Sequence, residues 1–290
     1  MSPVEAFGLV RRQCPALKEL LAPDDVWPAI VADAAAPNSA CHRSYLLLAY
    51  ERGCLPRITA PVHRFLFDGP RLHSKVTKQY RRDLEERWLV EIDEVARHER
   101  FRRFLGRIVE LQIADWLADR SWNVTGLEAL GATCDVQGSS PEHRSYSIEV
   151  KYIGQGTDDF RDVVDVLTGG PGTGSKSLYG ALNYLLFRVY EAALALRRCT
   201  GPKMAVVVID AQAWHVFDLP LENHWLNWET PSFLPTGEED WNEFLQRQRD
   251  CYPAIDSELA NVVGELERVW LVRLNSGYQY SLEYEYRLSG

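Results

Sequence analysis

Three ionisable residues, Asp135, Glu149 and Lys151, are spaced so that they could meet on one side of a β-hairpin. The segments "ATCDVQG" and "SYSIEVKYIG" alternate as strands do, and the polar segment "SSPEHR" between them is typical of a turn. In a hairpin symmetric about that turn, residue numbers of facing partners sum to about 284, which places Asp135 opposite Glu149. Two carboxylates facing each other repel unless a cation lies between them. The spacing therefore predicts a bound cation.

Lys151 follows Glu149 by two residues, so both side chains point to the same face of the strand. The opposite face is apolar, which predicts a half-buried strand. Its residues are Tyr146, Ile148, Val150 and Tyr152. The alternative is an ordinary solvated strand face carrying Glu149 and Lys151, with Asp135 as a nearby surface residue.

A fourth candidate, Glu110, lies in the segment "RFLGRIVELQIADWLADR", which has helical periodicity. Helical spacing places it on one face with Gly106, Ile113, Ala114 and Leu117. A carboxylate on a mainly apolar face is costly to bury without a partner. We expect Glu110 either to reach the edge of that face or to contact a cationic group.

The composition is that of a soluble globular protein with one large domain or two smaller ones: 290 residues, 46% apolar and 25% charged. The N-terminus lacks the pattern of a secretory signal, so we expect a cytoplasmic protein without a membrane span. Six scattered cysteines predict neither a disulfide framework nor a zinc site. A net charge of −9 argues against bulk electrostatic coating of nucleic acid, although Lys and Arg outnumber Asp and Glu over residues 60–108.

The surrounding segments predict an ordered set of elements. Helices are expected over residues 3–55 and 72–119, with a break at Pro56 to Gly69, and the order from Arg103 to Phe217 is helix, three strands, helix, strand. A further helical region and a terminal hairpin around residues 275–277 follow. We therefore predict three segments: a helical N-terminal region (1–69), a core with its leading helices (70–219) and a C-terminal extension (220–290).

With this order, the chain resembles the PD-(D/E)xK nuclease superfamily over Arg103 to Phe217. The resemblance implies a restriction-endonuclease-like fold of the mixed α/β class, with an αβββαβ core around a central mixed sheet. Glu110 stands where the family has its first-helix glutamate, Asp135 where it has a metal-binding aspartate, and Glu149 and Lys151 where it has the acidic residue and lysine of the third strand. Cys134 replaces the usual proline.

The resemblance implies Mg²⁺-dependent hydrolysis of DNA phosphodiester bonds, with RNA as a less frequent substrate and Mn²⁺ as a substitute ion. Asp135, Glu149 and the backbone carbonyl of Val150 would hold the ion, and Glu110 would complete its shell or bind a second ion. Lys151 would orient or deprotonate the attacking water or stabilise the transition state. We expect a homodimer or larger assembly, and a prokaryotic role in restriction or antiviral defence.

Two alternatives stay open. Residues 170–177, "GPGTGSKS", nearly match a phosphate-binding loop, and the strand ending at Asp210 could carry a magnesium-binding acid. Ser175, however, replaces the glycine that this loop requires before Lys176. In a weaker form of this reading, Lys176 and the following helix start hold a DNA phosphate. The other alternative is a binding or scaffold protein that has this fold and no hydrolytic activity.

Overall fold

The computed structural model describes residues 1–35, 45–51, 53, 55–66, 94–128, 133–153, 178–210, 262–275 and 279–288. These residues form two compact units. The first unit holds the described residues up to 121 together with 126–128, and the second holds 122–125, 133–153 and all described residues from 178 onward. The described residues thus fall into two units, and the three segments expected from the sequence stay a prediction.

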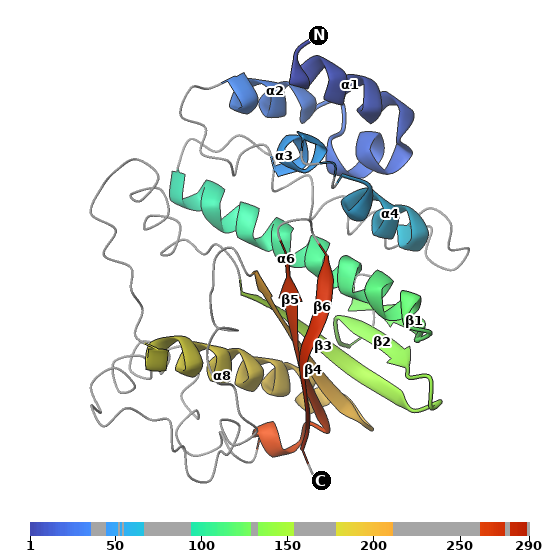
Figure 1. Ribbon diagram of the computed structural model, residues 1–290, viewed down its shortest axis with the longest axis vertical. Helices are drawn as coiled ribbons and strands as arrows, with labels where there is room; N and C mark the ends of the chain where they lie inside the picture. Colours follow the sequence, from blue (N-terminus) through green and yellow to red (C-terminus); the bar gives the residue numbers. More distant parts are fainter. Residues whose placement is uncertain are drawn as a thin grey trace. The chain divides into compact units, whose positions relative to one another are not determined.

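The first unit is helical, as expected for the N-terminal region. Its elements are α1 (Pro3–Gln13), the π-helical turn η1 (Leu17–Leu21), α2 (Trp27–Ala35), α3 (Tyr45–Glu51), α4 (Leu55–Leu66) and α6 (Glu94–Asp119) (Figure 1). Helix α1 begins with a capping box, in which Ser2 and Glu5 each accept a hydrogen bond from the other's backbone N–H. Within the described part of the chain, none of the helices is both long enough and apolar enough to cross a membrane.

The break expected from Pro56 to Gly69 is wrong over most of its length, because α4 runs through both of its prolines. Pro56 lies in the first turn, where a missing N–H is tolerated. Pro61 lies inside the helix and cannot donate to the carbonyl of Arg57. That carbonyl instead accepts a hydrogen bond from Nε2 of Gln112 on α6, at 3.4 Å. A partner from a distant part of the sequence therefore replaces the lost helical bond.

The described strands form a six-stranded sheet, in which they lie side by side in chain order (Figure 1). They are β1 (Asn123–Leu127), β2 (Val136–Ser139), β3 (Ser145–Ile153), β4 (Lys203–Asp210), β5 (Arg268–Leu274) and β6 (Tyr280–Arg287). The β2–β3 and β5–β6 pairs are antiparallel, whereas β3–β4 and β4–β5 are parallel. The predicted mixed sheet and terminal hairpin are confirmed, and the hairpin continues the same sheet.

Among the described residues, the elements follow one another in the predicted order of helix, three strands, helix and strand: α6, β1, β2, β3, α8 (Leu178–Ala195) and β4. A short 3-10 turn, η3 (Leu196–Arg198), follows α8. The helical part of the predicted C-terminal extension falls mostly outside the described residues.

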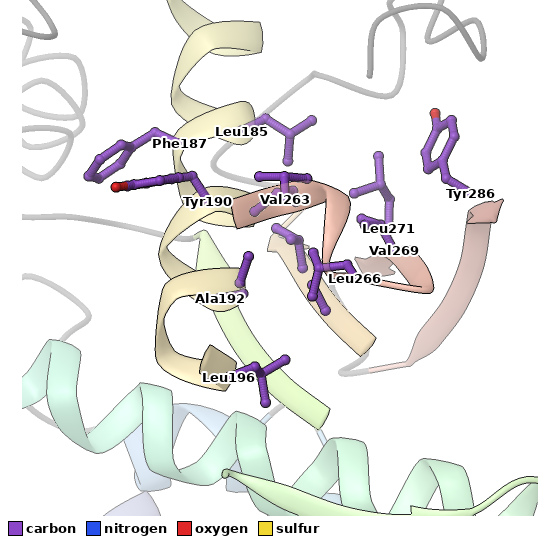
Figure 2. Close-up of a cluster of buried hydrophobic side chains, with 14 of the residues drawn as sticks. Leu185, Phe187, Tyr190, Ala192, Leu196, Val263, Leu266, Val269, Leu271 and Tyr286 are labelled. Carbon is purple, nitrogen blue, oxygen red and sulfur yellow. The ribbon is translucent and has the colours of Figure 1, made fainter. Parts of the chain in front are cut away.

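Helix α8 packs on the face of β3 that carries Glu149 and Lys151. These two residues are in parallel register with Ala205 and Val207 of β4, and residues in register share a face of the sheet. Ala205 and Val207 belong to a buried apolar cluster that includes Leu185 and other side chains of α8 (Figure 2). The half-buried strand predicted from the sequence is therefore wrong, because residues 146–150 are buried on both faces.

The turn that joins β2 to β3 fixes their alignment. The N–H of His143 donates to the carbonyl of Ser140 at 2.8 Å, with Pro141 at the second turn position, where its fixed φ is favourable. His143 itself has a φ of 64°, in the left-handed region. This compact turn sets the register on which the position of Asp135 depends.

Candidate metal centre

The register of the β2–β3 hairpin brings Asp135 opposite Glu149. Val136 pairs with Ile148 and Gln137 with Ser147, so the predicted sum of 284 is confirmed. Asp135 is the residue just before β2, and its Oδ2 accepts a hydrogen bond from the N–H of Val150 at 2.8 Å. The aspartate is thus held against β3 by the backbone of the residue that follows Glu149.

Both carboxylates are buried. Asp135 and Glu149 are each 8% exposed, so the alternative of a solvated strand face is wrong. Ionised carboxylates withdrawn from water are costly unless a cation or hydrogen-bond donors compensate them. The hairpin therefore holds two acidic groups in a place that requires positive charge.

Lys151 supplies part of this positive charge. Its Nζ donates to Oε1 of Glu149 at 2.8 Å, and its side chain is 20% exposed. Burial acts to lower the pKa of Lys151, but Glu149 and, more weakly, Asp135 raise it, and the net pKa lies above its usual range. The predicted convergence of Asp135, Glu149 and Lys151 is confirmed.

The backbone at Val150 is turned toward Asp135. Its N–H donates to the aspartate, whereas the N–H of Ser147 points the other way, to the carbonyl of Pro202 beside β4. In an extended strand, the N–H and C=O of one residue point to the same edge. The Val150 carbonyl is therefore directed to the Asp135 side, as the ligand set requires.

Helix α8 contributes a residue that sequence reasoning missed. Arg188 donates from Nη2 to the carbonyl of Tyr152 at 3.3 Å and from Nη1 to Oε2 of Glu191 at 2.5 Å. The hydroxyl of Tyr152 donates to Oδ2 of Asp210 at 3.3 Å. These contacts tie α8 and the end of β4 to the end of β3, beside Lys151. Only the position of Arg188 three residues before Glu191 could have hinted at this ion pair.

Glu110 lies on α6 in the first unit. It contacts a cationic group, which was one of the two outcomes expected from the sequence. Nη1 of Arg107 donates to Oε2 of Glu110 at 2.8 Å and to Oε2 of Glu128 at 2.5 Å. Burial acts to lower the pKa of Arg107, but the two carboxylates raise it above its usual range. Nothing in the sequence pattern indicated that Glu128 would take part in this ion pair. Because Asp135 belongs to the second unit, the predicted approach of Glu110 to it stays a prediction.

The residue before Asp135 is a buried thiol. Burial raises the pKa of Cys134 to about 11, and its Sγ donates to the carbonyl of Val136 at 3.3 Å. A protonated, hydrogen-bonded thiol is a poor nucleophile and a poor metal ligand. Cys134 is therefore a buried neighbour of Asp135 and not a candidate ligand.

Lys176 and the glycine-rich loop of residues 170–177 lie outside the described residues. Asp210, the acid that the nucleotide-binding alternative would use, is the last residue of β4 and accepts the hydrogen bond from Tyr152. Comparison with known protein families, with curated proteins and with solved structures found no match to this chain.

Proposed function

We propose that this chain is a metal-dependent nuclease of the PD-(D/E)xK type that hydrolyses phosphodiester bonds in DNA. The observation that carries the proposal is the buried pair of Asp135 and Glu149, facing each other across a hairpin, with Lys151 beside them. The order of elements from α6 to β4 supports the restriction-endonuclease-like core. A prokaryotic role in restriction or antiviral defence remains part of the proposal.

The donor set fits Mg²⁺. Asp135, Glu149 and the Val150 carbonyl offer only oxygen atoms, which hard divalent cations prefer. The charges also fit: Asp135 and Glu149 contribute −2, Lys151 contributes +1, and Arg188 is balanced by Glu191. Among these five residues, carboxylates outnumber cationic groups by one.

The chain's own residues have distinct tasks in the proposed reaction. Bound Mg²⁺ would lower the pKa of a water molecule and offset charge on the scissile phosphate. The Val150 N–H fixes the carboxylate of Asp135, and Lys151 fixes that of Glu149. Lys151 can also turn its remaining N–H donors toward a phosphate oxygen or the attacking water. Arg188 holds the backbone on the far side of Lys151.

Cleavage of supercoiled plasmid and of single-stranded DNA, with Mg²⁺ or Mn²⁺, tests this proposal. We expect cleavage by the wild type that EDTA abolishes, and losses of at least about 100-fold in Asp135→Ala and Lys151→Ala. Glu142→Gln is the matched control, because it removes an exposed carboxylate from the turn of the same hairpin. Circular dichroism establishes that each variant is folded.

The same samples separate the alternatives. If the folded wild type cleaves neither substrate with either ion, the enzyme proposal is wrong and a binding or scaffold role replaces it. Phosphate release from ATP that is lost in Lys176→Ala but retained in Lys151→Ala would instead favour the nucleotide-binding alternative.

A further inference from the structure

A cationic cavity lies where β4 and β5 begin and β6 ends. It has a volume of about 690 Å³, within the range of small-molecule sites. Its charged lining consists of Arg144, Lys203, Arg268, Arg287, Glu265 and Glu267. Arg268 is in register with Met204, and Met204 with Ile148, so Arg268 projects from the face opposite to Glu149. The cavity is therefore separate from the metal centre.

Five cationic side chains around the cavity share three carboxylates. Lys203 and Arg197 both pair with Glu265, at 2.5 and 3.8 Å. Arg268 and Arg287 both approach a single oxygen of Glu285, at 3.5 and 3.4 Å.

The fifth cation, Arg144, pairs with Glu267, which also accepts a hydrogen bond from the hydroxyl of Tyr146. The pKa of a further carboxylate, Glu142, is lowered most by the neighbouring Ser140 and also by the charges of Arg268 and Arg287. Among the described residues that line the cavity itself, four cations face two carboxylates. This positive excess occurs in a chain whose net charge is −9.

The cations that line the cavity differ in exposure. Lys203 and Arg268 have side chains 12% and 14% exposed and form the base of the cavity, whereas Arg144 and Arg287 are 55% and 73% exposed and flank its opening. The guanidinium groups of Arg144 and Arg268 lie 5.9 and 5.2 Å from the centre of the Tyr146 ring. The Tyr146 ring therefore contacts one cation at the base of the cavity and one at its opening.

We propose that this cavity binds the phosphate group of a phosphate-bearing ligand. Arginine forks match phosphate oxygens in pairs, and each arginine that shares a carboxylate retains N–H donors for a second anion. Glu265 and Glu267 in the lining disfavour weakly charged anions, so the ligand carries at least two negative charges. This inference does not depend on the proposed nuclease activity.

Calorimetric titration of the full chain with inorganic pyrophosphate, in EDTA, tests the inference. We expect a dissociation constant at or below about 1 mM, and binding at least about tenfold weaker in Arg268→Ala. Arg273→Ala is the matched control: it lies on the same strand, pairs with Glu283 at 3.1 Å and is outside the lining. Its affinity should equal that of the wild type.

A double variant, Arg144→Ala with Arg287→Ala, covers the case in which Arg268→Ala does not fold, because both of its side chains are more than half exposed. It should also bind pyrophosphate more weakly. Absence of binding by the wild type, or unchanged affinity in both the single and the double variant, would overturn the inference.

A short DNA duplex in the same buffer distinguishes the source of the phosphate. If pyrophosphate displaces the duplex and Arg268→Ala weakens both ligands, the cavity holds a nucleic-acid phosphate. If Arg268→Ala weakens pyrophosphate alone, the ligand is a free phosphate compound. Because no metal is present, both results are independent of whether the chain cleaves DNA.

Discussion

Asp135 has two tasks that a single substitution can separate. Its Oδ2 accepts a hydrogen bond from the N–H of Val150, and in the proposed function its charge helps to hold a cation. Asparagine retains an oxygen acceptor of the same shape, whereas alanine leaves a buried N–H without that partner.

We therefore predict that Asp135→Ala is less stable than Asp135→Asn by about 1–3 kcal/mol. Urea unfolding of the two variants measures the difference directly. Equal free energies of unfolding would mean that the Val150 N–H finds another partner and that Asp135 does not fix the hairpin end.

The reactivity of Cys134 tests whether the region around Asp135 is closed to solvent. Burial raises its thiol pKa to about 11, so at neutral pH it is almost entirely protonated. We predict that native Cys134 reacts with iodoacetamide much more slowly than the partly exposed Cys14, and that denaturation abolishes the difference. Peptide mass spectrometry measures the extent of alkylation at both cysteines in one sample. Equal alkylation of Cys134 and Cys14 in the native protein would show that the Asp135 region opens readily.

At the scale of elements, a hydrogen bond joins α4 and α6 at the position of a proline. Pro61 frees the carbonyl of Arg57, and Gln112 donates to it. Replacing Gln112 with alanine removes a donor to a carbonyl that the proline has already deprived of its helical partner.

We predict that Gln112→Ala costs about 0.5–1.5 kcal/mol in the wild-type chain and less in a Pro61→Ala background, where residue 61 regains its N–H. A double-mutant cycle by chemical denaturation measures this coupling. If the two substitutions are additive, the bond between α4 and α6 does not compensate for the proline.

The hairpin was predictable because its information is local. The turn residues fix the register, and period-two alternation places Glu149 and Lys151 together, so the facing pair followed from the sequence. The burial of that pair did not follow, because it depends on α8, which lies further along the chain. For the same reason Arg188 was missed: its contact with the Tyr152 carbonyl exists only once α8 packs on β3.

For helix α4, local signals in the sequence led to a wrong prediction. Its prolines are strong local signals against a helix, yet the acceptor left by Pro61 is satisfied from α6, more than fifty residues away. The position of β5 in the sheet could not be predicted either. The terminal hairpin could be recognised from its sequence, but the parallel pairing of β5 with β4 depends on the whole sheet.

At the scale of the whole molecule, charge opposes the proposed substrate. The chain carries −9, and the metal centre adds a local negative charge where a phosphate must approach. We predict that Asp135→Asn binds duplex DNA more tightly than the wild type in EDTA, by about two- to tenfold, because it removes one repulsive charge. Fluorescence anisotropy measures this affinity, with Glu19→Gln, which removes an exposed carboxylate of the first unit, as the control for net charge. Equal gains in both variants would show that only net charge matters and that DNA does not approach Asp135.

The central claim is that Asp135 and Glu149 hold a divalent cation, and Mn²⁺ binding followed by electron paramagnetic resonance tests it without any substrate. The wild type should show saturable binding that is lost in both Asp135→Ala and Glu149→Ala and retained in Glu142→Gln. Binding of the same affinity and stoichiometry in folded Asp135→Ala and Glu149→Ala would contradict the metal centre, and with it the proposed nuclease.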